Sequence, residues 1–110
     1  MVNSSEGVVP RPLTEEELRK LIGQAIDAKH PSHPETFHAR FDHLERGLQI
    51  DDVIHGLECN WKFERPPEFN RKHWQWKYYI GTETVDGHPL TVVIAVDTRE
   101  RSFEVITRWR

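Results

Sequence analysis

The stretch that decides the fold reads HARFDHLERGL at residues 38–48 and is followed by DDV at residues 51–53. Apolar side chains recur through it at the three- and four-residue spacing of an amphipathic helix. We therefore expect a helix over about residues 35–46 that ends at Gly47, because glycine readily adopts the left-handed conformation that closes a helix. The apolar face of this helix would consist of Phe37, Phe41, Leu44 and Leu48.

Two further helices are expected, one on each side of this stretch. The first begins at Thr14, since Thr14 and Glu17 form a capping-box pattern, and it ends near His30, where prolines follow. The second is short and covers about residues 50–57, with an acidic first turn that the helix dipole favours.

From residue 60 onward apolar residues alternate with polar ones, which is typical of half-buried strands. The expected strands are residues 61–64, 74–80, 90–96 and 103–109. The first should end at Pro66-Pro67, because proline interrupts strand pairing, and the basic loop 66–73 would then suit a substrate or partner contact. The sequence thus predicts an α+β fold, with two or three N-terminal helices packed on one face of a four-stranded antiparallel sheet.

Length and composition limit the function classes. The 110 residues suffice for one domain, which we expect to span residues 13–110 after a flexible N-terminal segment of residues 1–12. No apolar run is long enough for a membrane helix and no secretory signal is visible, so we expect a cytoplasmic protein without membrane contact. The single Cys59 excludes an internal disulfide, and the seven histidines match no zinc-binding spacing. We therefore expect neither a metal nor another cofactor.

Charge is distributed unevenly along the chain. The formal net charge is −3, which disfavours a strongly electrostatic nucleic-acid binder. Residues 1–59 carry 6 Lys and Arg against 11 Asp and Glu, whereas residues 60–110 carry 9 against 7. The stretch 60–77 also contains tryptophans and phenylalanines among its cations, a combination that suits stacking of nucleic-acid bases. The local charge of the C-terminal half is therefore compatible with a polyanionic partner.

Three short motifs stand at fixed spacing ahead of the strands: His38-Ala39, Arg46-Gly47-Leu48 and Asp51-Asp52-Val53. Their order resembles a small bacterial domain family that is grouped with the RelE/ParE/BrnT-like toxin fold, which is itself similar to the barnase and EndoU class of ribonuclease domains. The resemblance covers about residues 35–110 and implies a RelE-like α+β fold and a toxin-like, RNA-acting function. One position departs from the pattern, because the family usually has an arginine where this chain has Asp42.

Metal-independent RNA cleavage needs a base for the 2′-hydroxyl proton, an acid for the leaving oxygen and cations for the phosphate. His38 is the candidate base, because histidine titrates near neutrality, and Arg46 and Tyr79 complete the predicted catalytic set. The predicted substrate-binding residues are Arg40, Arg71, Lys72, Lys77 and Arg108. The alternative is that His38 only holds its segment in place through hydrogen bonds, with Arg46 paired to a neighbouring carboxylate.

The leading hypothesis is a toxin-like domain that binds RNA and cleaves it without a metal. The alternative is a non-enzymatic interaction module that uses the same fold to bind an antitoxin-like protein partner or a second copy of itself. A catalytically inactive relative with a regulatory role is a third possibility. The enzyme hypothesis predicts that His38, Arg46 and Tyr79 meet in an open cleft, whereas the module hypothesis predicts an exposed apolar surface around Phe69 or at a sheet edge.

Overall fold

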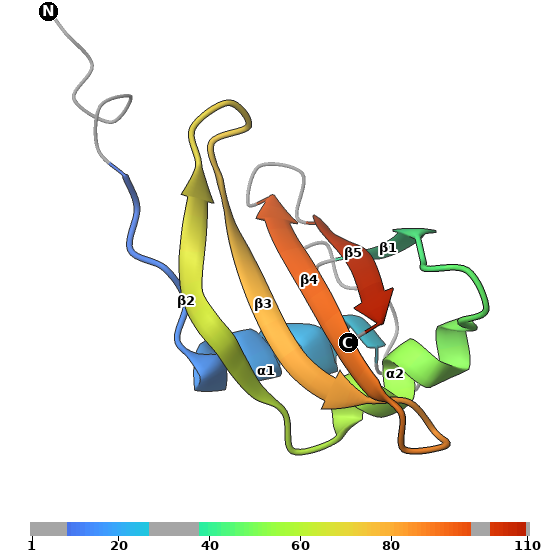
Figure 1. The fold of residues 1–110 in the computed structure, drawn as a ribbon. Helices are drawn as coiled ribbons and strands as arrows, with labels where there is room; N and C mark the ends of the chain where they lie inside the picture. The colour runs from blue at the N-terminus through green and yellow to red at the C-terminus, as the bar shows by residue number, and fades with distance from the viewer. Residues whose placement is uncertain (1–8, 27–37, 98–101, 110) are drawn as a thin grey trace, which may run out of the picture.

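A computed structural model describes residues 9–26, 38–97 and 102–109. These residues form two helices and five strands, arranged in one mixed sheet (Figure 1). The elements are α1 (Glu15–Ile26), β1 (His38–His43), α2 (Ile50–Glu58), β2 (Lys62–Asn70), β3 (Gln75–Glu83), β4 (Pro89–Asp97) and β5 (Ser102–Trp109). The sheet order is β1-β5-β4-β3-β2, in which β1 runs parallel to β5 and the other neighbours are antiparallel.

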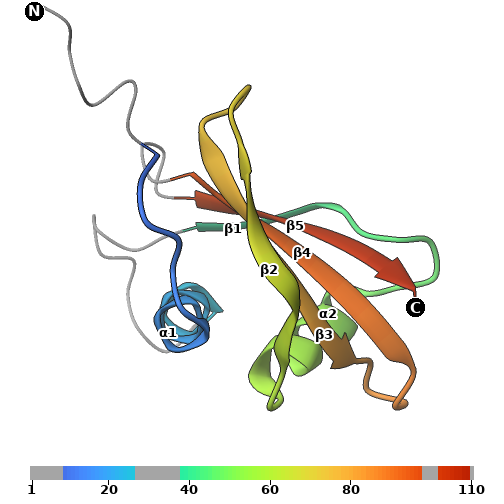
Figure 2. The same ribbon diagram turned by 60° about the vertical axis from the view of Figure 1, so that its left-hand side comes forward.

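Both helices lie on the same face of the sheet (Figure 2). The core fills the space between them, and the strands contribute to it every second residue, as the pleat requires. Its largest fully buried side chains include Trp61, Tyr78, Phe103, Leu18 and Ile22. The opposite face of the sheet has no helix over it among the described residues.

The start of α1 confirms the predicted capping box. The Glu17 amide donates to Thr14 Oγ1 at 3.1 Å, and the Thr14 amide donates to Glu17 Oε1 at 3.0 Å. Just before the helix, the Leu13 amide donates to the Tyr78 hydroxyl at 2.8 Å, and the Trp76 indole donates to the Pro10 carbonyl at 2.8 Å. Residues 9–13 therefore lie against β3, whereas residues 1–8 of the segment expected to be flexible are outside the described residues.

The expected helix over residues 35–46 is wrong, because residues 38–43 form strand β1. Residues 35–37 are outside the described part. Ala39 and Phe41 pack partly buried against the core, with the exposed Arg40 between them, so the segment also satisfies a two-residue period. Pairing with β5 selects the extended form, since a local apolar pattern cannot report a partner that is distant in sequence. Gly47 still has the expected left-handed conformation, with a φ of 91°, but in a turn rather than a helix end.

The expected four-stranded antiparallel sheet is also wrong, because β1 adds a fifth and parallel strand. In addition, β2 does not end at Pro66-Pro67 but continues to Asn70. The prolines are tolerated because β2 is an edge strand and its register with β3 shifts between Arg65 and Glu68. Most of the predicted loop 66–73 is therefore strand, and only residues 71–74 form the turn between β2 and β3.

The predicted short helix after residue 50 is confirmed as α2, nine residues long. Within the described parts of the chain, neither helix has the length and apolar character needed to cross a membrane.

Candidate functional site

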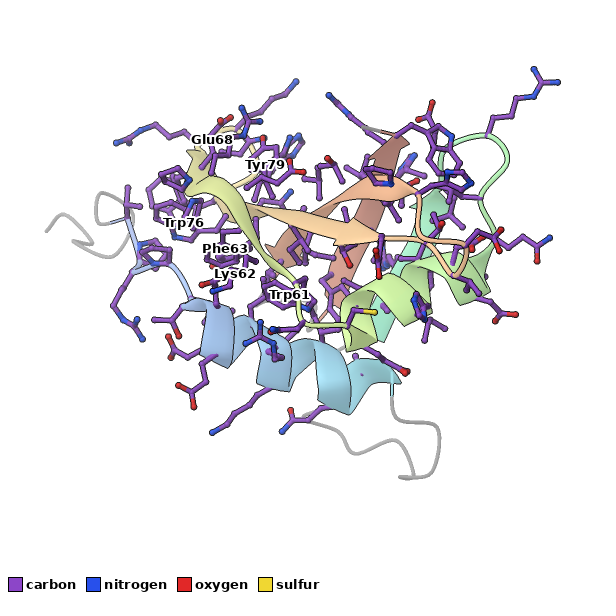
Figure 3. All side chains as sticks on the ribbon, turned by 60° about the horizontal axis from the view of Figure 1, so that its bottom comes forward. Trp61, Lys62, Phe63, Glu68, Trp76 and Tyr79 are labelled. Carbon is purple, nitrogen blue, oxygen red and sulfur yellow. The ribbon has the colours of Figure 1, made fainter. Side chains whose placement is uncertain are left out.

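The uncovered face of the sheet carries the polar side chains of the central strands. Lys77 and Tyr79 on β3 alternate with core residues, and Tyr79 pairs across β4 and β5 with Val93 and Ile106. Figure 3 shows Tyr79 and Glu68 on the side of the sheet away from the helices. In the same view, Trp61 lies between the sheet and the helices. The face is thus the surface at which strand side chains meet solvent.

A pocket of about 330 Å³ is hollowed into this face. It is lined by Glu64, Arg65, Tyr79, Thr91, Val93, Arg108 and Trp109, which come from β2, β3, β4 and β5. We call it the sheet-face pocket. Its volume lies at the lower end of the range typical of small-ligand sites.

The register of β2 brings a cation over an aromatic ring in this pocket. Phe63 pairs with Ile80 on the core side, but the register then shifts so that Arg65 pairs with Tyr79. The Arg65 guanidinium carbon lies 3.6 Å from the centre of the Tyr79 ring. This is a cation–π contact, which holds the guanidinium in the wall of the pocket.

A carboxylate is oriented in the same wall. The Thr91 hydroxyl donates to Glu64 Oε1 at 2.7 Å, and Thr91 itself is buried. Because a hydrogen bond from a buried hydroxyl restricts the carboxylate, Glu64 holds a defined position beside Arg65 and Tyr79.

The pocket ends at the last residues of β5. Arg108 is exposed there, and the Trp109 indole donates to the Arg46 carbonyl at 3.2 Å. Trp109 remains 45% exposed, and its ring meets the His88 ring edge to face at 6.5 Å. Arg108 pairs with Thr91 on the pocket side of the sheet, whereas Trp109 pairs with the core residue Leu90 and directs its indole to the 45–46 loop at the end of β5.

Across the sheet from Tyr79 lies a further titratable pair. His43 on β1 pairs with Ile106 on β5. Ile106 pairs in turn with Val93 on β4, and Val93 pairs with Tyr79 on β3. The His43 Nε2 atom lies 2.7 Å from Glu104 Oε1, with both side chains partly exposed. The Glu104 carboxylate thus places a negative charge beside the His43 ring at this edge of the face.

Of the predicted catalytic residues, Tyr79 lines the sheet-face pocket, whereas Arg46 does not line it and its carbonyl accepts a hydrogen bond from Trp109 at the end of β5. His38 is on β1 opposite Ser102, whereas the Tyr79 row meets β5 at Ile106. Three strand spacings and four residues along β5 separate the two backbones, roughly 19 Å. The His38 side chain is outside the described residues, and the sheet does not bring the two backbones together.

The predicted substrate-binding residues divide into three groups. Arg108 lines the pocket, and Lys77 is two positions from Tyr79 on the same face of β3. Arg40 lies at the far end of the row that runs from Lys77 through Ala95 and Glu104. Arg71 and Lys72 are exposed in the β2–β3 turn, away from the pocket.

Sequence reasoning did not single out Glu64, Arg65, Thr91 or Trp109 as site residues. The first strand was expected to end at Pro66-Pro67, so the pairing of Arg65 with Tyr79 was not predicted. One signal was available, since Thr91 is the only polar residue in the apolar run 90–96. A lone hydroxyl within a buried strand usually has a specific partner, which is here Glu64.

A group of side chains that could hold a metal lies on the other side of the sheet, at the end of α2. It consists of His55, Cys59 and Glu83. The spacing of these residues along the sequence does not reveal the group. Glu83 belongs to β3, and only the fold brings it to the end of α2.

No protein-family model, curated protein or solved structure matches this chain. The resemblance to the RelE/ParE/BrnT-like group therefore stays a prediction.

Proposed function

We propose that the protein binds single-stranded RNA at the sheet-face pocket and cleaves it without a metal ion, acting in the cytoplasm. The observation that supports this most is the composition of the pocket. Two guanidinium groups and a tyrosine line it together with a carboxylate that Thr91 orients, and an exposed tryptophan ends β5 next to Arg108. These are the groups needed to hold a phosphodiester, stack a base and accept a proton.

Binding would use the two arginines and the two aromatic rings. Arg65 and Arg108 offer planar donor edges that match phosphate oxygens in pairs. Trp109, exposed at the end of β5, would offer a ring on which a base beyond the pocket can stack, a contact worth about 1–3 kcal/mol per base. Unstacked bases are accessible only in single strands or loops, so we favour single-stranded RNA over a duplex.

Cleavage would begin at Glu64. The carboxylate takes the proton of the ribose 2′-hydroxyl, and the 2′-oxygen attacks the adjacent phosphorus. The bond from phosphorus to the 5′-oxygen then breaks, leaving a 2′,3′-cyclic phosphate and a 5′-hydroxyl that receives its proton from Tyr79. Arg65, stacked on the Tyr79 ring, stabilises the phenolate that this transfer leaves. Arg108 offsets the charge on the pentacoordinate phosphate.

The net charge of −3 does not count against this face, because local charge governs docking. Arg40, Arg65, Lys77 and Arg108 stand there with Glu64, Glu68 and Glu104, an almost balanced set. Affinity should therefore depend on a few directed contacts, and it should fall less steeply with salt than that of a strongly basic domain.

Incubation of the purified protein with bulk RNA in excess EDTA tests the proposal. Wild type should cleave, and Glu64→Gln should reduce the rate by roughly 100-fold or more, the usual range for removal of a general base. Arg108→Ala should reduce it about 10- to 100-fold, as expected for one charged hydrogen-bonding group. Glu16→Gln, an exposed carboxamide substitution on α1, is the matched control and should cleave like wild type.

The same assay distinguishes the two candidate bases. If Glu64 is the base, His38→Ala retains most of the activity. Loss of activity in His38→Ala with full activity in Glu64→Gln would instead return the role to His38. Absence of cleavage by a folded wild-type protein would contradict the enzymatic part of the proposal.

The second candidate is the interaction module, which is favoured by an apolar pocket on the helix side. About 280 Å³ in volume, it is lined by Pro10, Arg11, Leu13, Leu21, Trp74, Gln75, Trp76, Tyr78 and Val96. Phe69 stands beside it, edge-on to Trp74 and Trp76 at 5.0 and 5.1 Å. Apolar side chains of a protein partner would fit there. If the Trp74→Ala variant still cleaves RNA, the apolar pocket is not part of the RNA site in the sheet-face pocket.

A further inference from the structure

We propose that His55, Cys59 and Glu83 form a binding site for a divalent zinc ion, separate from the sheet-face pocket. The residues come from two elements: His55 is in the last turn of α2, Cys59 is its C-cap, and Glu83 ends β3. Their ligand atoms, one per residue, all lie within 4.8 Å of one another.

The helix places its two ligands side by side. Residues four apart lie on one face of a helix, and Cys59 Sγ is 3.4 Å from His55 Nε2. Zinc bonds of about 2.3 Å to sulfur and 2.0–2.1 Å to nitrogen at a tetrahedral angle imply a separation of about 3.5 Å. The observed distance between these two atoms therefore fits a zinc ion that both residues bind. A thiol–imidazole hydrogen bond has a similar length, so the third ligand is what distinguishes a metal site.

The third ligand is held near by a close approach of backbones. Gly56 is buried, and a Cβ atom added to it would lie 2.8 Å from Thr82 Cγ2 and 3.0 Å from the Glu83 carbonyl oxygen. The Thr82 hydroxyl donates to the Gly56 carbonyl at 2.7 Å. Because glycine lets α2 touch the end of β3, the Glu83 carboxylate is carried to the imidazole and the thiol.

The surroundings leave room for the ion and a fourth ligand. A hollow of about 510 Å³ is lined by Cys59, Asn60, Thr82 and Glu83. His55 and Cys59 are half-buried while Glu83 is exposed, so the ion would enter from the Glu83 side. One nitrogen, one sulfur and one carboxylate oxygen, with water in the fourth position, form a donor set that zinc accepts. The ion would link α2 to β3 on the face opposite the pocket.

Cobalt is the probe that reports the sulfur ligand directly. One equivalent of Co²⁺ added to the reduced full chain, carrying no histidine tag, should produce a sulfur-to-cobalt charge-transfer band that Zn²⁺ abolishes by displacement. Cys59→Ser should remove the band. His55→Gln should weaken Co²⁺ binding by more than about 100-fold, because loss of even an outer-shell partner costs 10- to 100-fold. His73→Gln, an exposed histidine in the β2–β3 turn, is the matched control and should leave binding unchanged.

Glu83→Gln keeps the test decisive if substitutions on α2 disturb folding, since Glu83 is exposed. It should keep the charge-transfer band but bind at least about 10-fold more weakly. The proposal is overturned if saturating Co²⁺ gives no charge-transfer band, if Cys59→Ser keeps the band, or if Glu83→Gln binds like wild type.

Discussion

At the scale of single residues, two helical glycines have opposite roles. Gly23 on α1 is exposed, and a Cβ atom there would have no neighbour within 4 Å. A Cβ atom on Gly56 of α2 would lie 2.8 Å from Thr82 Cγ2, which requires something to move, and 3.0 Å from the Glu83 carbonyl oxygen, which is a tight approach. Sequence alone marks Gly56 as a weak point of its helix, because glycine disfavours helix. Only the fold shows that Gly56 is required for contact with β3.

Alanine substitutions at the two sites should therefore shift stability in opposite directions. Gly23→Ala should raise the free energy of unfolding by about 0.5–1 kcal/mol, because alanine has the higher helix propensity and restricts the unfolded chain. Gly56→Ala should lower it by about 1–3 kcal/mol, since strain against β3 exceeds that gain. Urea denaturation of both variants measures the difference. A stabilised Gly56→Ala protein would mean that α2 and β3 are not in close contact.

At the scale of elements, the start of α1 carries a pH-dependent contact. The Glu17 carboxylate accepts hydrogen bonds from Arg11 and from the Thr14 amide. These hydrogen bonds lower the pKa of its carboxyl from 4.5 to about 2. A lowered pKa in the folded state stabilises the protein above pH 4.5, and this contribution disappears as the pH falls towards 2. The contact is solvent-exposed, so salt should also weaken it.

Glu17→Gln should consequently be less stable than wild type at pH 7, and the difference should vanish near pH 2. Thermal unfolding of both proteins between these limits provides the comparison. In an Arg11→Leu background the pH-dependent part should shrink, because Arg11 is the largest cause of the lowered pKa. A difference that is the same at pH 7 and at pH 2 would exclude this account of the helix start.

Also at this scale, elements with one clear period could be predicted and the ambiguous one could not. The stripe of α1, the acidic start of α2 and the alternation in β3 and β5 each match a single structure. Residues 38–43 fit both periods, and their partner β5 lies at the other end of the chain. The strand through Pro66-Pro67 was also beyond local reasoning, because only its edge position permits it.

At the scale of the whole molecule, the sheet-face pocket depends on how five strands are ordered. Tyr79 and Arg108 were predicted as site residues on the sheet. They line the same pocket because β4 pairs with both of their strands. Glu64 and Arg65 join them only through the register of β2, which no local pattern encodes. The central claim is that this assembled face, rather than the helix side, contacts RNA.

Titration of the ¹⁵N-labelled protein with a short 2′-O-methyl oligoribonucleotide, followed by amide chemical shifts, tests this claim most directly. The substituted 2′-oxygen prevents cleavage, so the experiment reports binding alone. Shifts should concentrate on Arg65, Tyr79, Thr91 and Arg108, and Arg108→Ala should weaken them. Shifts confined to α1, α2 and the apolar pocket, or none at saturating oligonucleotide, would contradict the account.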